Sequence, residues 1–241
     1  MATLCPALIS ILIPFSMVSS SLPLRTVLET LSTRIMLISA FPIRLVSAFF
    51  CALFFSLGAA ATERHLLVLG DSISAGYGMS ENESWPSLLA EQLPKHYRLT
   101  NASVSGETTA GALRRLPGLL AENRFDIVII ELGGNDGLRG YPVAGIRKNL
   151  ATLIRQSQQH GANVALMSMK IPPNYGRRYT AAFEAVYAAL AEEHQITLLP
   201  FILDDIATNP QLMQADGIHP NAQAQPLIVT KVLTGLEGLL N

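Results

Sequence analysis

Cysteine is scarce in this chain of 241 residues, and its two copies, Cys5 and Cys51, both lie in the first quarter. The rest of the chain therefore has no thiol for a disulfide, for nucleophilic attack or for metal binding through sulfur. A run rich in lysine and arginine is also missing. Residues 62–241 carry 14 basic and 17 acidic side chains, a net charge of −3 with histidine neutral. A mildly acidic chain without a basic patch is not expected to bind nucleic acid.

A long apolar run is missing as well. The run 45–57 (LVSAFFCALFFSL) has only 13 residues, whereas roughly 18 to 20 are needed to span a bilayer. It follows Arg44 and precedes Ala59 and Ala61, which satisfy the small-x-small rule of signal-peptide cleavage. The sequence therefore predicts a secretory signal cut after Ala61, with a retained membrane anchor as the alternative. We expect an exported protein, periplasmic or secreted, without a stable membrane anchor once the signal is removed.

The segment before this run is not needed for a signal. A start at Met36 gives MLISAFPIRLVSAFF, an ordinary signal sequence, so Met36 is the predicted true start. The chain from 62 to 241 has 180 residues, which suits one domain with a sizeable core. We therefore expect an N-terminal leader over 1–61 and a single domain over 62–241.

Short apolar runs alternate with helix-like stretches after the leader. The predicted strands are 66–69, 98–102, 127–132, 164–169 and 197–201, and the predicted helices are 84–93, 108–121, 143–160, 179–193 and 222–240. Three of the strands are almost continuously apolar, as expected of central parallel strands covered on both faces. The alternating order predicts an α/β fold in three layers, with a mostly parallel sheet of about five strands between helices.

Polar, glycine-rich clusters follow the first three predicted strands. They are Gly70-Asp71-Ser72, the segment 103–106 (SVSG) and the segment 133–137 (GGNDG), and a fourth polar cluster occupies 216–219 (DGIH). Ligands of such folds bind beyond the carboxyl ends of the strands. Four polar clusters on that rim predict an active site. Ser72 alone is weak evidence, because serine is also a common helix N-cap.

His219 differs from the other four histidines because an acid, Asp216, precedes it by three residues. One tight turn can bring the Asp216 carboxylate to Nδ1 of His219, leaving Nε2 free to take a proton from a hydroxyl group. The alternative is a turn in which Asp216 only caps the chain before the last helix. Asp204 and Asp205 are the rival orienting acids. His65, His96, His160 and His194 are predicted to be solvated surface groups.

Acyl transfer needs hydrogen-bond donors aimed at the negative oxygen of its intermediate. The side chain of Asn135 and the backbone N–H groups of Gly106 and Ser72 could supply them. A plain turn or an acidic metal loop are the alternatives for 133–137. A metal is not expected, because Asp136 lacks neighbouring ligands. The first strand is followed by no glycine pattern for nucleotide phosphates, and no cofactor is expected.

Taken together, the blocks Gly70-Asp71-Ser72, Gly106, Gly133-x-Asn135-Asp136 and Asp216-x-x-His219 resemble the SGNH, or GDSL-type, hydrolase family. The strings NASVSGETT, ELGGNDGLRG, PPNYGRRY and DGIHPNAQAQP are similar to bacterial periplasmic members that act on acyl-CoA thioesters, lysophospholipids and aryl esters. The resemblance covers essentially all of 65–235 and implies a flavodoxin-like α/β/α sandwich. It implies Ser72 as nucleophile, His219 as base and Asp216 as orienting acid, with oxyanion donors at Ser72, Gly106 and Asn135.

The resemblance also implies a monomeric serine esterase whose substrates are small lipids or esters with fatty acyl chains. Leu138, Tyr141, Pro173 and Tyr175 are predicted to line an apolar groove for the acyl chain, or else to anchor their loops. Two other functions remain open. One is a carbohydrate O-acetylesterase with the same catalytic residues, and the other is a non-catalytic lipid-binding protein.

Overall fold

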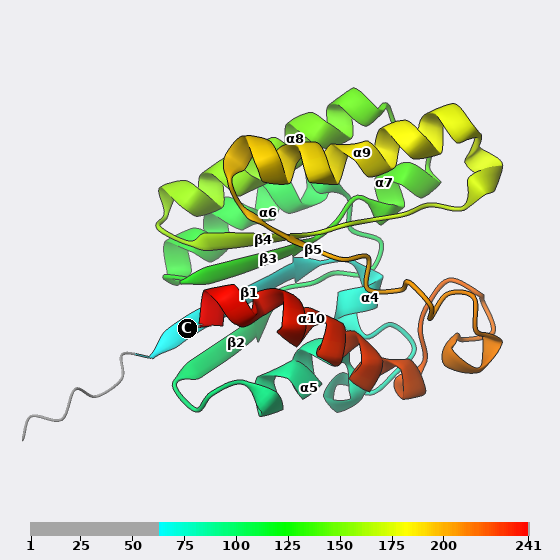
Figure 1. Ribbon diagram of the computed structural model, residues 1–241. Helices are drawn as coiled ribbons and strands as arrows, with labels where there is room; N and C mark the ends of the chain where they lie inside the picture. Colours follow the sequence, from blue (N-terminus) through cyan, green and yellow to red (C-terminus); the bar gives the residue numbers. More distant parts are fainter. Residues whose placement is uncertain (1–62, 241) are drawn as a thin grey trace, which may run out of the picture. The chain divides into compact units, whose positions relative to one another are not determined.

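The computed structural model describes residues 63–240, which form a central β-sheet between two layers of helices (Figure 1). The sheet has five strands in the order β2-β1-β3-β4-β5, and every neighbouring pair is parallel. The strands are β1 (Arg64–Gly70), β2 (Tyr97–Asn101), β3 (Ile127–Glu131), β4 (Asn163–Met167) and β5 (Thr197–Leu199). The predicted three-layer α/β fold is thereby confirmed.

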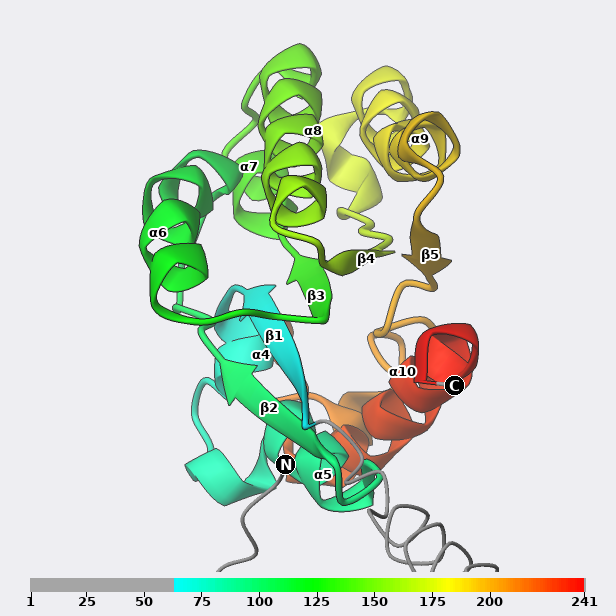
Figure 2. The ribbon, with the colours of Figure 1, turned by 90° about the vertical axis from the view of Figure 1, so that its left-hand side faces the viewer.

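Two groups of helices cover the two faces of the sheet (Figure 2). One face carries α6 (Thr109–Glu122), α8 (Val143–Gln159) and α9 (Arg177–His194), and the other carries α5 (Trp85–Gln92) and α10 (Gln225–Leu240). Two short helices, α4 (Ser72–Ala75) and α7 (Gly134–Leu138), start just after β1 and β3. Single 3₁₀ turns occupy Glu81–Glu83, Pro173–Tyr175, Pro210–Leu212 and Ala222–Ala224.

The strand β1 shows why the sheet lies at the centre of the core. Leu67 and Leu69 pack into the cluster under α6, α8 and α9, whereas Leu66 and Val68 pack into the cluster under α5 and α10. All four side chains are completely buried. Successive residues of a strand point to opposite faces, so a strand with apolar residues at every position must be covered on both sides. Each such side chain contributes about 1.5–3 kcal/mol through its burial.

The predicted elements lie where the sequence patterns indicated, with ends that differ by a few residues. The short helices α4 and α7 were not predicted, because four or five residues are too few for a helical repeat of apolar positions to emerge. Among the described residues, no helix is long and apolar enough to cross a membrane. The predicted leader, 1–61, lies outside the described residues.

One histidine was predicted wrongly. His65 lies within β1 and is only 6% exposed. Its Nε2 lies 2.7 Å from Oγ1 of Thr100 and its Nδ1 2.9 Å from the Arg98 guanidinium, both on the neighbouring strand β2. Burial lowers the pKa of His65, which favours the neutral ring. The flanking charged residues suggested a solvated group, but cross-strand partners satisfy this ring inside the fold.

Candidate active site

Ser72 is the first residue of α4, immediately beyond the carboxyl end of β1. The helix N-cap is Asp71, whose Oδ1 accepts a hydrogen bond from the backbone N–H of Ile73 at 3.1 Å. The helix ends after one turn at Gly76, which adopts a left-handed conformation with φ of 72°. Capping therefore falls to Asp71, and the hydroxyl group of Ser72 is available for other contacts.

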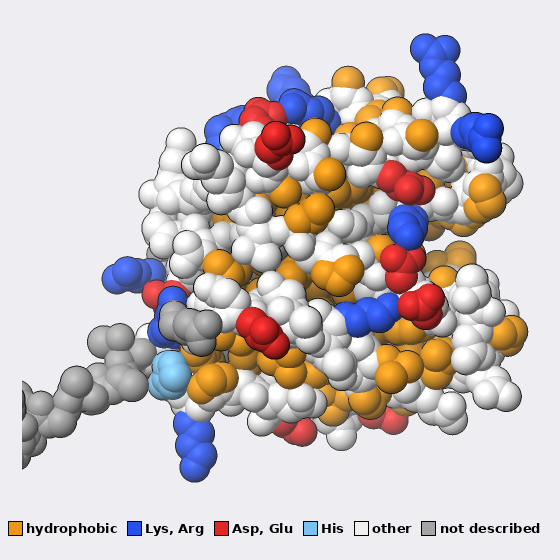
Figure 3. Space-filling model, viewed as in Figure 1, with side chains coloured by type: hydrophobic (Ala, Val, Ile, Leu, Met, Phe, Trp, Pro, Cys, Tyr) orange, Lys and Arg blue, Asp and Glu red, His pale blue; other side chains and the backbone are white. Residues whose placement is uncertain are grey.

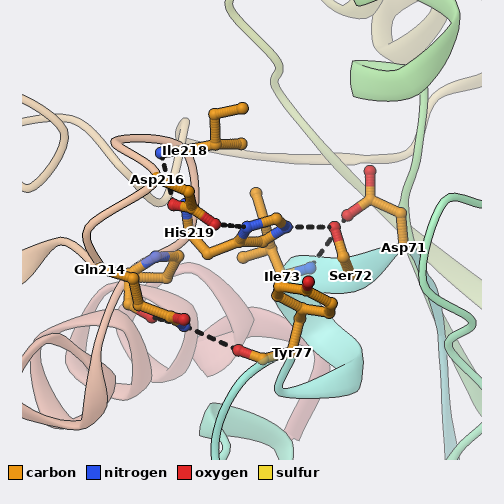
Figure 4. Close-up of polar contacts among 9 residues, drawn as sticks. Asp71, Ser72, Ile73, Tyr77, Gln214, Asp216, Ile218 and His219 are labelled. Atoms are coloured by element: carbon orange, nitrogen blue, oxygen red, sulfur yellow. Dashed lines mark hydrogen bonds and ion pairs between the residues drawn. The ribbon is translucent and has the colours of Figure 1, made fainter.

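The hydroxyl of Ser72 meets a histidine and an acid from the far end of the chain (Figure 4). Nε2 of His219 lies 2.8 Å from Oγ of Ser72, and Nδ1 of His219 lies 2.7 Å from Oδ2 of Asp216. Oδ1 of Asp216 accepts hydrogen bonds from the backbone N–H groups of Ile218 and His219, at 2.9 and 3.0 Å. Asp216 thus closes a local turn with one oxygen and contacts the imidazole with the other, whereas the cap before the last helix is Asn221, whose side chain accepts from the Gln223 N–H.

The same hydrogen bonds control the charge of Asp216. The pKa of its carboxyl is lowered to about 2, first by the His219 N–H, then by the His219 ring and the Ile218 N–H. A group with this pKa is ionised throughout the neutral range. The rival acid Asp204 is instead paired with Lys170, at 2.6 Å between Oδ1 and Nζ. Asp216 is therefore the carboxylate that meets the histidine.

The loop that carries His219 is a small closed structure. An antiparallel bridge pairs Met213 with Pro220, and the backbone N–H of Gln214 donates to the carbonyl of His219 at 2.8 Å. Gly217, at φ of 66°, makes the tight turn between them. The side chain of Gln214 donates through Nε2 to the carbonyl oxygen of Tyr77 at 2.7 Å, which ties this loop to the segment after α4.

The predicted oxyanion donors lie at the ends of three adjacent strands. Asn135 is the second residue of α7, after β3, and Gly106 (φ of 76°) lies in the loop after β2. Among the described residues, no acceptor binds the backbone N–H of Ser72 or of Gly106. Nδ2 of Asn135 donates to Oδ2 of Asp71 at 3.1 Å. Ser72, Gly106 and Asn135 all line one cavity, together with His219.

The sequence analysis assigned no role to two acids that are buried at this site. Asp71 is 3% exposed and Glu131, the last residue of β3, is completely buried. Oε2 of Glu131 accepts from Oγ of Ser74 at 2.6 Å and from the backbone N–H of Asp71 at 3.2 Å. Burial raises the pKa of Asp71 to about 6 and that of Glu131 well above its ordinary value. The available signal was an acid at the end of an otherwise apolar strand.

Asp136 also has a definite partner within the chain. Its two carboxylate oxygens accept from Thr109, from the hydroxyl group at 2.7 Å and from the backbone N–H at 2.9 Å. Thr109 is the first residue of α6 and is fully buried. The contact therefore joins the start of α6 to α7, the helix that presents Asn135.

A mainly apolar cavity of about 590 Å³ opens beside Ser72. The carboxyl-end loops of β4 and β5 supply many of its apolar walls, namely Met169, Ile171, Pro172, Pro173, Phe201, Leu203 and Ala207, with Ile73, Leu138 and Met213 from other segments. Lys170, Asp204 and Asp205 add charge to its lining. Figure 3 shows a notch at the right-hand edge of the molecule, with acidic and basic side chains gathered beside it.

Only two of the four predicted groove residues line this cavity. Leu138 and Pro173 do, but Tyr141 and Tyr175 do not. The hydroxyl of Tyr175 donates to the carbonyl of Leu138 at 2.7 Å, and the carbonyl of Tyr141 accepts from the hydroxyl of Tyr179 at 2.6 Å. Both tyrosines thus join the loop after α7 to the region around α9. They hold the loops in place, as the alternative interpretation proposed.

Comparison with known proteins shows the family to which this chain belongs. The family described as GDSL-like Lipase/Acylhydrolase matches residues 68–226, which include all the site residues above. The chain belongs to this family. An arylesterase of Vibrio mimicus is a family relative that is 48% identical over 190 residues, which cover 77% of this chain and 94% of the relative.

Two further relatives agree with this assignment. The thioesterase 1/protease 1/lysophospholipase L1 of Escherichia coli K12 is 44% identical over 182 residues, covering 76% of this chain and 88% of that protein. A crystal structure of TesA superposes with a TM-score of 0.71 at 46% identity, covering 73% of this chain and 99% of that one. The similarity thus extends over nearly the whole length of these relatives.

Proposed function

We propose that this protein is a serine esterase that hydrolyses carboxylic esters and thioesters of fatty acyl chains through an acyl-enzyme on Ser72. The observation that carries the proposal is the chain of short contacts from Oγ of Ser72 to Nε2 of His219 (2.8 Å) and from Nδ1 of His219 to Asp216 (2.7 Å). Serine is a weak nucleophile by itself and needs an oriented base of this kind. The names of the relatives, arylesterase and thioesterase 1/protease 1/lysophospholipase L1, support the same reaction class.

The reaction follows from the positions of these groups. Oγ of Ser72 attacks the carbonyl carbon of the substrate while Nε2 of His219 takes the hydroxyl proton, and Asp216 stabilises the imidazolium that forms. The backbone N–H groups of Ser72 and Gly106 and the amide of Asn135 bind the oxyanion. The C–O or C–S bond then breaks, and His219 gives its proton to the leaving alkoxide or thiolate. Water, activated by His219, attacks the acyl-enzyme, releases the acid and restores Ser72.

The cavity supports a fatty acyl substrate over an acetyl group. Its volume of about 590 Å³ and its largely apolar lining suit a long hydrocarbon chain, and an acetyl group would leave most of it empty. Leu138 lies on the same helix as Asn135, and Pro173 lies in the loop after β4. We propose these two residues, with Met169 and Ile171, as contacts of the acyl chain.

A chain-length series on the purified protein, with Ser72→Ala beside it, tests this function. We expect hydrolysis of p-nitrophenyl esters from acetyl to palmitoyl, of palmitoyl-CoA and of a lysophospholipid, and almost no activity of Ser72→Ala on any of them. Activity confined to the acetyl ester would favour an O-acetylesterase. A folded protein that binds fatty acid but hydrolyses none of these esters would be a lipid-binding protein instead.

We also infer that the enzyme works after export, as a monomeric domain of residues 62–241. The small-x-small site at Ala59 and Ala61 after the apolar run 45–57 supports removal of the leader. Mass spectrometry of the protein from the periplasm should give an N-terminus at Thr62, and light scattering should give the mass of one copy. An intact leader in a membrane fraction would contradict the cleavage, and a dimer mass would contradict the monomer.

A further inference from the structure

Asp71 makes more contacts than a helix cap needs. It is 3% exposed, and its two carboxylate oxygens accept hydrogen bonds from two different segments. Oδ1 accepts from the backbone N–H of Ile73 in α4, and Oδ2 accepts from Nδ2 of Asn135 in α7, each at 3.1 Å. A Cβ atom at Gly134 would lie 3.3 Å from Oδ2, so a glycine beside Asn135 leaves room for this approach.

The second of these contacts determines which way the Asn135 amide faces. The oxygen and the nitrogen of an amide have nearly the same shape, so sterics alone do not choose between the two orientations. An ionised carboxylate only accepts hydrogen bonds, and Oδ2 of Asp71 therefore selects the orientation that turns the NH₂ group toward it. The amide nitrogen has a second hydrogen, which is left for the oxyanion of a substrate in the cavity that Asn135 lines.

We propose that Asp71 is a positioning residue, whose carboxylate fixes the amide of Asn135 with its nitrogen available to the oxyanion. This inference rests on the proposed function, because Asn135 needs this orientation only if an oxyanion forms there. Asp71 does not touch the reacting atoms. It acts through Asn135, while its other oxygen holds the first turn of α4, so one carboxylate sets the relative position of the nucleophile and one oxyanion donor.

The backbone of Asp71 is held in place by Glu131 on the neighbouring strand. Gly70 and Glu131 are paired in register at the carboxyl ends of β1 and β3, and Oε2 of Glu131 accepts from the Asp71 N–H at 3.2 Å. A Cβ atom at Gly70 would lie 2.7 Å from this oxygen. Burial raises the pKa of Asp71 to about 6, so at pH 8 the group is ionised and both oxygens accept.

A pure capping role makes a different prediction for Asp71→Asn. Asparagine is as good an N-cap as aspartate, so a cap alone would tolerate this change. An amide at position 71 has one accepting oxygen instead of two, and it cannot serve Ile73 and Asn135 together. If Asp71 positions Asn135, the change must therefore turn or release the Asn135 amide.

The test compares full-length wild type, Asp71→Asn, Asn135→Ala and the double variant at pH 8 with a p-nitrophenyl ester. We expect Asn135→Ala to lower kcat by about 10²–10³-fold. Asp71→Asn should lower kcat by about tenfold or more with little change in KM, because the lost interaction belongs to the transition state. The double variant should be no slower than Asn135→Ala alone, since both changes remove the same donor.

Asp126→Asn is the matched control. Asp126 also accepts a hydrogen bond from a backbone N–H, that of His65 at 2.8 Å, but it lies at the opposite end of β1.

The outcomes separate this inference from the proposed function. An Asp71→Asn enzyme within twofold of wild type, or losses in kcat that multiply in the double variant, would overturn the positioning role alone. An Asn135→Ala enzyme with unchanged kcat would overturn the oxyanion site itself. If Asp71→Asn does not fold by circular dichroism, Asp71→Ser replaces it. Serine keeps a capping oxygen for Ile73 and leaves no acceptor for Asn135, so the same drop in kcat is expected.

Discussion

The ring of Tyr77 packs against the imidazole of His219, with 4.5 Å between the ring centroids and a tilt of 36° between the planes. Tyr77 follows the helix of the nucleophile, and its carbonyl oxygen accepts from Nε2 of Gln214 in the histidine loop (Figure 4). Ser72 and His219 are 147 positions apart in the sequence. These two contacts join their segments directly beside the site, so the 2.8 Å approach of Oγ to Nε2 does not depend on the distant core alone.

Replacement of Gln214 by alanine should therefore lower both the stability of the fold and the rate of catalysis. The change removes the hydrogen bonds from Nε2 to the carbonyls of Tyr77 and Pro220, at 2.7 and 3.1 Å. We expect the free energy of unfolding to fall by about 1–2 kcal/mol, and kcat/KM to fall by about tenfold because His219 is less well placed. Gln211→Ala, at an exposed position near the same loop, is the control. Equal kcat/KM for the two variants would contradict the role of Gln214.

Gly133 should be intolerant of any side chain. It has φ of 112°, and a Cβ atom there would lie 2.2 Å from the hydroxyl of Tyr187, which is 1% exposed and donates to the carbonyl of Leu132. Gly133→Ala combines backbone strain with overpacking, and we expect it to lower the free energy of unfolding by about 3 kcal/mol or more.

Gly118 provides the matched comparison. It lies in the exposed part of α6, and a Cβ atom there meets nothing within 4 Å. Gly118→Ala should raise the free energy of unfolding by about 0.5–1 kcal/mol, because alanine loses less backbone entropy in a helix. Urea unfolding of both variants measures the difference. A Gly133→Ala protein as stable as Gly118→Ala would show that the α7 turn can rearrange.

The sequence predicts the fold well where a single local pattern decides it. The apolar runs of β1, β3 and β4 are typical of strands covered on both faces, and the three-residue spacing of Asp216 and His219 makes their contact local. The Asp71–Asn135 and Ser74–Glu131 contacts join positions 64 and 57 residues apart. No spacing rule indicates such pairs, because their proximity comes from the parallel pairing of β1 with β3. Tyr175 was misplaced for a related reason, since its sequence context cannot show whether a loop tyrosine faces the cavity or bonds to a neighbouring loop.

The buried charge of Asp71 predicts an unusual dependence of stability on pH. Burial raises the pKa of this carboxyl from 3.8 to about 6 in the folded protein. Between about pH 4 and pH 6 the native state therefore binds more protons than the unfolded chain, and the contribution of Asp71 to stability decreases as the pH rises through this window. A shift of about two pKa units corresponds to about 3 kcal/mol. Glu131 from β3 and His219 from the opposite loop face the same carboxyl group. Both residues are present in wild type and in the variant compared below.

Asp71→Asn removes this titration, so its stability relative to wild type should rise with pH. We expect the difference in unfolding free energy, variant minus wild type, to increase by about 3 kcal/mol between pH 4 and pH 7. Urea unfolding of both proteins at pH 4, 5, 6 and 7 gives this difference directly. A difference that is flat over that range would mean that Asp71 titrates with an ordinary pKa. If Asp71→Asn is more stable than wild type at a pH where its kcat is lower, the carboxylate is kept for its contact with Asn135, at a cost to the stability of the fold.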